Sequence, residues 1–163
     1  MEIERKFLVK YVPDNISEYV HHEVSQGYIY TSPVIRIRRS DDRFYLTVKS
    51  DGFLKREEFE IDITEEAFKD LSLKCEGNII SKTRYKIPLE DGLTAELDVF
   101  HGAFEGLMYV EVEFPTEEAA NSFIAPDYFG RDVTESEGYQ NSALSAMDKD
   151  EIRRFLEDVI VSK

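Results

Sequence analysis

Apolar and charged residues alternate along most of the chain, beginning with its first segment. In MEIERKFLVK, Glu2, Glu4 and Lys6 occupy every second position, and Ile3 and Phe7 lie between them. Because successive side chains of a strand point to opposite faces, this alternation predicts a strand with one charged and one apolar face. Comparable segments, separated by turn signals, predict strands at about residues 2–10, 24–31, 34–40, 43–50, 56–63, 79–87, 94–100 and 107–114.

Turn and helix signals connect these strands. Asp-Gly pairs at 51–52 and 91–92 lie between alternating segments, which favours tight hairpins and an antiparallel sheet that can close on itself. Thr-Glu-Glu sequences predict capped helices at about 64–73 and 116–124, and residues 14–20 predict a short helix. Apolar residues at helical spacing, from Leu144 to Ile160, predict an amphipathic C-terminal helix at about 141–161.

Composition and charge restrict the classes of function. The chain has 163 residues, 42% of them hydrophobic, which is enough for one domain spanning 1–163. A net charge of −14 argues against binding to nucleic acid or to an anionic membrane, and it suits a protein that collects divalent cations. Cys75 is the single cysteine, so no intramolecular disulfide can form. Because no signal peptide or membrane-spanning apolar run is visible, we expect a cytoplasmic protein.

The charged faces of seven predicted strands carry almost nothing but ionised side chains. An ordinary solvated sheet face explains any single strand, but such a face normally mixes hydroxyl, amide and charged groups. Several strands carry two like charges about 7 Å apart, which are tolerated when a ligand of opposite charge lies between them. Acidic pairs therefore indicate a metal, and basic pairs a polyanion. The acids are Glu2, Glu4, Glu58, Glu60, Glu96, Asp98, Glu111 and Glu113, and the bases are Lys6, Arg36, Arg38, Lys49, Arg56, Lys82, Arg84 and Lys86.

The apolar faces indicate which side of the sheet is the inside. If the amphipathic helices cover a curled sheet from outside, the charged face turns inward. About eight strands closed into a barrel leave room for side chains and one small ligand. Charges in such a lumen need water, ions or ligand to offset their desolvation.

The ordered set ExExK (Glu2 to Lys6), QGYIY, RIRR, LTVKS, EEFEI, KTRYKI, ELDVF and VEVEF resembles the triphosphate tunnel metalloenzymes of the CYTH superfamily over about residues 1–145. The resemblance implies an α+β, predominantly β fold: an eight-stranded antiparallel closed β-barrel with helices outside and a C-terminal amphipathic helix. Members of this family bind inorganic, nucleoside or thiamine triphosphate with Mg²⁺ or Mn²⁺. Most hydrolyse a terminal phosphoanhydride, one branch cyclises ATP, and short bacterial members are commonly inorganic triphosphatases.

The resemblance also implies roles for individual residues. As metal ligands it implies Glu2, Glu4, Glu96, Asp98, Glu111 and Glu113. As phosphate-binding bases it implies Lys6, Arg36, Arg38, Lys49, Arg56, Lys82 and Arg84. Catalytic roles fall to Glu58, Glu60, Lys49 and Lys82, with one of the two glutamates orienting water. Crowded lysines of lowered pKa would favour an alkaline rate profile.

Two motifs near the C-terminus differ from the family pattern. The chain has Asp132-Val133-Thr134 where members often have Glu-Val-Thr, and Gly138-Tyr139-Gln140-Asn141 where they often have Arg-Tyr-x-Asn. These differences concern the segment that closes on the ligand and leave the barrel motifs intact. His21 and His22 are expected at the surface and Cys75 is expected to be a spectator, because no spaced ligand set or partner accompanies them.

We therefore expect metal-dependent hydrolysis of a small-molecule substrate, inorganic triphosphate. The alternatives are an adenylate cyclase or an organic triphosphatase of the same fold, and a non-catalytic polyphosphate or nucleotide binder. The absence of an obvious insertion for a base or ribose pocket favours the inorganic substrate. A homodimer is also open, because the C-terminal segment can cap its own barrel or pack on a partner.

Overall fold

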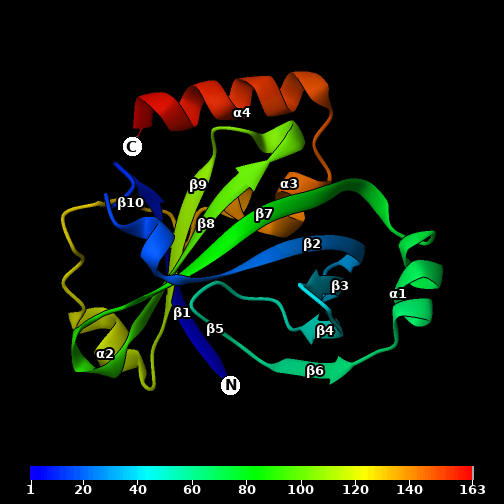
Figure 1. Cartoon of the computed structure of the whole chain (residues 1–163), viewed down its shortest axis with the longest axis horizontal. Coiled ribbons are helices and arrows are strands. Elements are labelled where there is room, and N and C mark those ends of the chain that lie inside the picture. The colour runs from blue at the N-terminus through cyan, green and yellow to red at the C-terminus, as the bar shows by residue number, and fades with distance from the viewer. Residues whose placement is uncertain (163) are drawn as a thin grey trace.

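The computed structural model describes residues 1–162 and is dominated by one antiparallel sheet (Figure 1). Lys163, the last residue of the predicted domain, lies outside the described residues. The strands are β1 (Glu2–Val9), β2 (Val20–Thr31), β3 (Val34–Ser40), β4 (Arg43–Lys49), β5 (Lys55–Arg56), β6 (Glu58–Asp62), β7 (Glu76–Pro88), β8 (Thr94–His101), β9 (Met108–Glu113) and β10 (Phe129–Asp132). The α-helices are α1 (Glu65–Ser72), α2 (Glu117–Ser122), α3 (Asn141–Ser145) and α4 (Lys149–Ser162), and four short 3-10 turns are η1 (Ile16–Glu18), η2 (Glu90–Gly92), η3 (Gly102–Phe104) and η4 (Glu137–Tyr139).

The sheet closes into a barrel through the segment that contains β5 and β6. The strand order is β10-β1-β9-β8-β7-β2-β3-β4-β6, and β5 pairs with β1 through Glu2 opposite Arg56 and Ile3 opposite Lys55. Only Glu57 separates β5 from β6, so this segment joins β4 on one side to β1 on the other. β10 continues along the same edge of β1 as β5. The ring therefore has eight wall segments, and the predicted closed barrel is confirmed.

The eight predicted strands all correspond to strands of the structure, with two differences of detail. Residues 56–63 form β6 and part of the separate two-residue β5, which allows the segment to turn from one neighbour to the other. β10 was not predicted, because its four residues, FGRD, have no alternating pattern. The predicted helices at 64–73 and 116–124 correspond to α1 and α2, and each begins with a Thr cap: Thr64 and Thr116 accept from the backbone N–H three residues on, at 3.0 Å.

The single C-terminal helix predicted at 141–161 is instead two helices, α3 and α4, interrupted at 146–148. Asp148 caps α4, because its Oδ1 accepts from Glu151 N at 2.8 Å while Glu151 Oε1 accepts from Asp148 N at 3.3 Å. This reciprocal arrangement is a capping box, and it starts a new helix where the apolar spacing alone predicts continuation. Asn78 of β7 satisfies the carbonyls released at the break, donating to Leu144 O and Met147 O.

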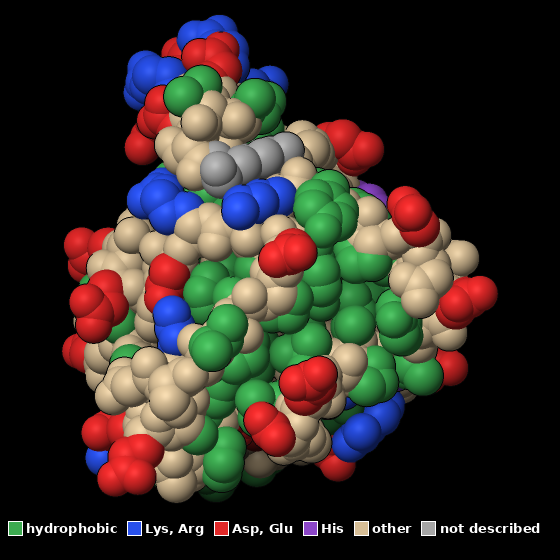
Figure 2. Space-filling model, turned by 90° about the vertical axis from the view of Figure 1, so that its left-hand side faces the viewer, with side chains coloured by type: hydrophobic (Ala, Val, Ile, Leu, Met, Phe, Trp, Pro, Cys, Tyr) green, Lys and Arg blue, Asp and Glu red, His purple; other side chains and the backbone are tan. Residues whose placement is uncertain are grey.

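Most of the apolar outer face of the barrel is covered. On the β1, β9 and β8 side, α2 and the segment after it cover Ile3, Phe7 and Val112, and ring pairs such as Phe7–Phe129 at 5.0 Å fill the interface. Figure 2 shows this side of the molecule, with hydrophobic side chains gathered in its centre and acidic side chains around them. Within residues 1–162, no helix is long and apolar enough to cross a membrane.

A second apolar cluster closes one end of the barrel. Inward-facing residues at that end, including Leu8, Ile80 and Tyr109, are apolar or aromatic and not ionised. They pack with Leu144 of α3 and Ile152 of α4, which lies across the end of the strands (Figure 1). The barrel is therefore a blind tunnel: charged along its middle, open at one end, and plugged at the other by its own C-terminal helices.

We expect Leu144→Ala to lower the free energy of unfolding by about 2–5 kcal/mol, because Leu144 is fully buried and its truncation leaves a cavity in the plug. Leu73→Ala is the matched control: Leu73 is 87% exposed, and its truncation should change stability by less than about 0.5 kcal/mol. Urea unfolding measures both. Equal effects of the two substitutions would contradict the placement of Leu144.

Candidate active site

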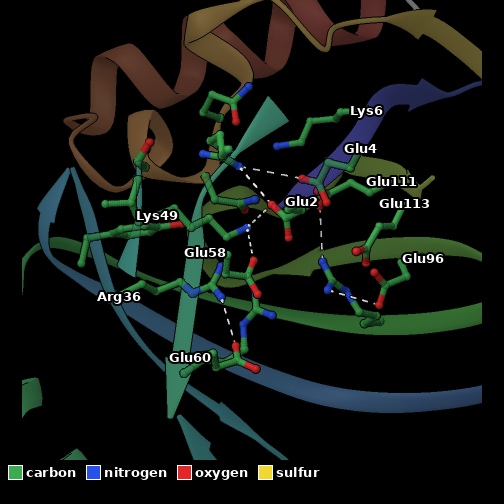
Figure 3. Close-up of a pocket in the computed structure, with 18 residues that line it drawn as sticks. Glu2, Glu4, Lys6, Arg36, Lys49, Glu58, Glu60, Glu96, Glu111 and Glu113 are labelled. Atoms are coloured by element: carbon green, nitrogen blue, oxygen red, sulfur yellow. Dashed lines mark hydrogen bonds and ion pairs between the residues drawn. The ribbon is translucent and has the colours of Figure 1, made fainter. Parts of the chain in front are cut away.

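A charged cavity occupies the middle of the barrel (Figure 3). It is lined by thirteen of the fifteen predicted site residues, seven acids and six bases. They are Glu2, Glu4, Lys6, Arg36, Arg38, Lys49, Arg56, Glu58, Glu60, Arg84, Glu96, Glu111 and Glu113. Their strands place them on one face through the sheet register: Lys49 lies opposite Glu58, Lys6 opposite Glu111, and Glu2 opposite Arg56.

The register separates the two signs of charge around the wall. On β1, β9 and β8, acids lie opposite acids: Glu4 faces Glu113, and Glu111 faces Glu96. Bases dominate the wall formed by β3, with Arg36 and Arg38 on its inner face. Like charges directly opposite each other destabilise a sheet unless something of opposite charge intervenes. The cavity therefore has an acidic wall suited to cations and a basic wall suited to anions.

Lys82 and Asp98 also face the inside of the barrel, but they lie deeper than the cavity, next to the apolar plug, where Lys82 Nζ is over the ring of Phe100. Both side chains are fully buried, and Lys82 Nζ lies 2.8 Å from Asp98 Oδ2. Asp98 also accepts two hydrogen bonds from Arg84, at 2.8 Å from Nε and 2.9 Å from Nη2. Burial lowers the pKa of Lys82 to about 7 against the opposing charge of Asp98. This geometry favours a supporting position for both residues, with Arg84 as the group that they present to the cavity. Lys86, on the same face, is exposed at the open end.

Arg84 and Lys49 are the centres of two ion-pair groups in the cavity. Besides Asp98, Arg84 contacts Glu96 at 3.4 Å and Glu111 at 3.3 Å. Lys49 Nζ lies 2.9 Å from Glu2 and 3.4 Å from Glu58. These charge-assisted contacts, dashed in Figure 3, offset the desolvation of the groups that make them.

Two bases have no such partner, because the ion pairs of residues 1–162 include neither Lys6 nor Arg38. Lys6 Nζ donates only to Tyr139 O, at 3.3 Å, and lies over the ring of Tyr109. Arg38 Nε donates to Gln26 Oε1 at 2.8 Å. Burial, followed by the charges of Arg36 and Arg84, lowers the pKa of Arg38 to about 9. Both are positioned cationic donors to which an anion can bind.

Several acids, in contrast, lie close to other acids, which changes their pKa values. Burial, followed by the charge of Glu111, raises the pKa of Glu4 well above its usual value. Burial and a hydrogen bond with Glu58 likewise raise the pKa of Glu2. Burial acts in the same direction on Glu111, but Lys6 and the hydrogen bond from Glu4 hold its pKa well below the usual range. In each of the pairs Glu4–Glu111 and Glu2–Glu58, the pKa of one carboxyl group is raised and that of its neighbour is lowered, as expected for two acids close together.

The carboxylate pairs can hold a divalent cation if phosphate and water supply its other ligands. Within residues 1–162, no three Asp, Glu, His or Cys side chains form a ready-made ligand set. Mg²⁺ needs only one or two protein carboxylates when phosphate oxygens and waters supply the remaining ligands. The donor set thus fits a metal that binds together with a phosphate anion.

A model of the CYTH domain family matches residues 1–139. The chain belongs to the CYTH family. It is 46% identical over 147 residues to a protein of Nitrosomonas europaea named inorganic triphosphatase, with 88% of this chain and 96% of the relative covered. A protein of Acetivibrio thermocellus with the same name is 41% identical, with 88% and 92% covered. The crystal structure of an inorganic triphosphatase is 42% identical, covers 91% of this chain and 96% of its own, and gives a TM-score of 0.68.

Sequence reasoning missed the neutral residues of this CYTH cavity. Tyr28 and Val34 share the inward face with the charged positions, so their parity could have identified them. Gln140, Asn141 and Ser142 come from the start of α3, which reaches the cavity from the plugged end. The motif that contains Gln140 and Asn141 was expected in the segment that closes on the ligand, but strand parity does not apply to a helix, so their side chains were not predicted as cavity residues.

For this CYTH protein in EDTA, we expect Glu4→Gln to reduce the loss of stability at rising pH. A carboxyl group with a raised pKa contributes stability below its unfolded pKa, near 4.5, and that contribution is lost as the pH rises through its folded pKa. Glutamine cannot ionise, so the variant should be more stable at pH 8, by on the order of 1 kcal/mol.

Denaturant unfolding between pH 5 and 9 measures this difference, with the exposed Glu66→Gln as control. Parallel pH profiles for wild type and Glu4→Gln would show that Glu4 is not crowded by Glu111.

Proposed function

We propose that this CYTH protein hydrolyses inorganic triphosphate to pyrophosphate and phosphate with Mg²⁺ or Mn²⁺. The observation that carries the proposal is the cavity itself: six bases and seven acids face one another in a blind tunnel. A binder of polyanions alone gains little from an acidic wall. A metal-dependent hydrolase needs both walls, because phosphoryl transfer depends mainly on positioning and charge neutralisation.

The basic residues would hold the phosphate groups. Lys6 and Arg38 are free to bind an anion, and Arg36 is tied only to Thr47 Oγ1, at 3.2 Å, with Glu60 4.0 Å away. Arg84 presents a guanidinium already oriented by Asp98. Triphosphate carries about four to five negative charges at neutral pH, which such a set of donors can match by charge and by bidentate geometry.

The acidic wall would hold the metal, with Glu2 and Glu4 as one carboxylate pair and Glu111 and Glu113 as a second. When bound, a divalent ion neutralises phosphate charge and lowers the pKa of a coordinated water. Glu96 keeps its place beside Arg84 and is the next candidate ligand.

Glu58 or Glu60 would orient the attacking water. Glu60 accepts from Thr47 Oγ1 at 2.9 Å, which fixes one of its oxygens and leaves the other for water. Glu58 is less free, because Lys49 and Glu2 both contact it. A carboxylate in either position can accept a proton from water as the P–O bond forms, while the leaving pyrophosphate stays on the basic wall.

The neutral lining favours an inorganic substrate. Tyr28 and Val34 are the apolar residues that line the cavity among those described, so a nucleobase or thiazolium would find little surface on which to stack. The two curated relatives are named inorganic triphosphatase. We therefore prefer inorganic triphosphate over ATP, whether cyclised or hydrolysed, and over thiamine triphosphate. A cytoplasmic location and a homodimer stay predictions from the sequence.

We expect the purified protein to release phosphate from tripolyphosphate with Mg²⁺ or Mn²⁺ and to lose all activity in EDTA. ATP and thiamine triphosphate should be hydrolysed at least about tenfold more slowly at equal concentration, because the cavity offers their organic groups little contact. Cyclic AMP formation from ATP would favour the cyclase alternative. Failure to hydrolyse any triphosphate with either metal would leave only the binder.

We expect Arg38→Ala to lower kcat/KM for tripolyphosphate by about 10²–10³-fold, because it removes a half-buried cation from the phosphate wall. Arg39→Ala provides a matched control from the next position, since Arg39 points to the exposed outer face and donates to Asp41 O. Steady-state kinetics on both variants, with urea unfolding to verify the fold, measures the difference. Similar activity in the two variants would refute the phosphate role of Arg38.

A further inference from the structure

One neutral side chain at the plugged end of the cavity has an unpaired acceptor. Gln140, Asn141 and Ser142 line the cavity there. Gln140 Nε2 donates to Thr134 O at 3.3 Å, so its amide is already engaged. Asn141 Oδ1 is buried and has no hydrogen-bond partner among the described residues. Asn141 Nδ2 also makes no hydrogen bond among the described residues, and because the residue lines the cavity, this donor is available to a ligand that carries acceptor oxygens.

The position of Asn141 is fixed by the way α3 packs on the barrel. Leu144, one turn further on, is fully buried in the plug, and Asn78 donates to its carbonyl oxygen at 3.1 Å. Gly77 approaches α3 so closely that an added Cβ would lie 1.9 Å from Ser145 O. These contacts come from β7 and hold the C-terminal end of the five-residue helix α3, which keeps Asn141 at its other end in place. A side chain on such a support can bind a ligand without first being ordered.

We propose that Asn141 binds the phosphoryl group at the leading end of the substrate, the group that enters the blind tunnel first. Nδ2 would donate to a phosphate oxygen. This inference rests on the proposed function. An amide suits this place because it supplies a donor without adding charge to the thirteen ionisable groups already present.

The alternative is that Asn141 serves only the packing of α3, and one substitution separates the two roles. Asn141→Asp is nearly isosteric, and a carboxylate is well tolerated in the first turn of a helix, so packing alone predicts an unchanged fold and unchanged binding. A ligand role predicts repulsion between the new carboxylate and the phosphate. Asn141→Ser keeps a neutral donor and acceptor, and Asn121→Asp adds the same charge at an exposed position on α2.

The test measures tripolyphosphate binding by calorimetry in EDTA, where no turnover occurs, and kcat and KM with Mg²⁺. We expect Asn141→Asp to raise Kd and KM at least tenfold, Asn141→Ser to raise them less than about fivefold, and Asn121→Asp to leave both unchanged. Urea unfolding should show all variants folded.

Equal Kd values for Asn141→Asp and wild type would overturn this inference alone. An equal loss in Asn121→Asp would also overturn it, because the effect would then come from overall charge. If wild type neither binds nor hydrolyses tripolyphosphate, the inference falls together with the proposed function.

Discussion

The burial of Asp98 between Lys82 and Arg84 is the interaction on which the charged tunnel depends. All three side chains lie inside the barrel wall, and neither Asp98 nor Lys82 contacts solvent. An isolated buried carboxylate would be prohibitively costly, but two cations and a bidentate geometry offset its desolvation. The result is a guanidinium fixed at the cavity surface, from which Arg84 reaches Glu96 and Glu111 on the neighbouring strands.

In most small barrels the side chains that fill the interior form the apolar core, whereas here the middle of the interior is charged. The interior is ionised, so the apolar area that stabilises the fold must be buried elsewhere. Two clusters provide it: one lies outside the strands beneath α2, and the other fills the end of the tunnel against α3 and α4. The helices are therefore necessary for the barrel and not additions to it. They also make the tunnel blind, because the C-terminal helices that bury the plug occupy one of its two ends.

Strand alternation could predict which residues face inward, because parity is a local property of the chain. It could not predict depth along the tunnel. Lys82 and Arg84 have the same parity, yet Lys82 is buried deeper, beside the plug, and Arg84 lines the cavity, a distinction set by where the plug ends. The capping residues Asp148 and Glu151 could have predicted the break before α4. The prediction of one continuous helix relied instead on the apolar spacing of the segment. Asn141 belongs to a motif that resembles the family's Arg-Tyr-x-Asn, but its position in the cavity could not be predicted, because that position depends on Gly77 and Asn78, over 60 residues away.

Charged groups without a partner of opposite charge lie close together in the cavity. A ligand that neutralises them would therefore also stabilise the fold. Burial and the charge of Glu111 raise the pKa of Glu4, while Lys6 and Arg38 make no ion pair among the residues described. Arg38 lies on β3, away from the acids of β1 and β9, and Lys6, although opposite Glu111, donates only to Tyr139 O. A metal–phosphate complex would satisfy both walls at once, as cation and anion enter together and neither wall is left with excess charge. Under the proposed function, a simple monovalent anion or a free metal ion would satisfy only one wall, whereas a metal–triphosphate complex would satisfy both.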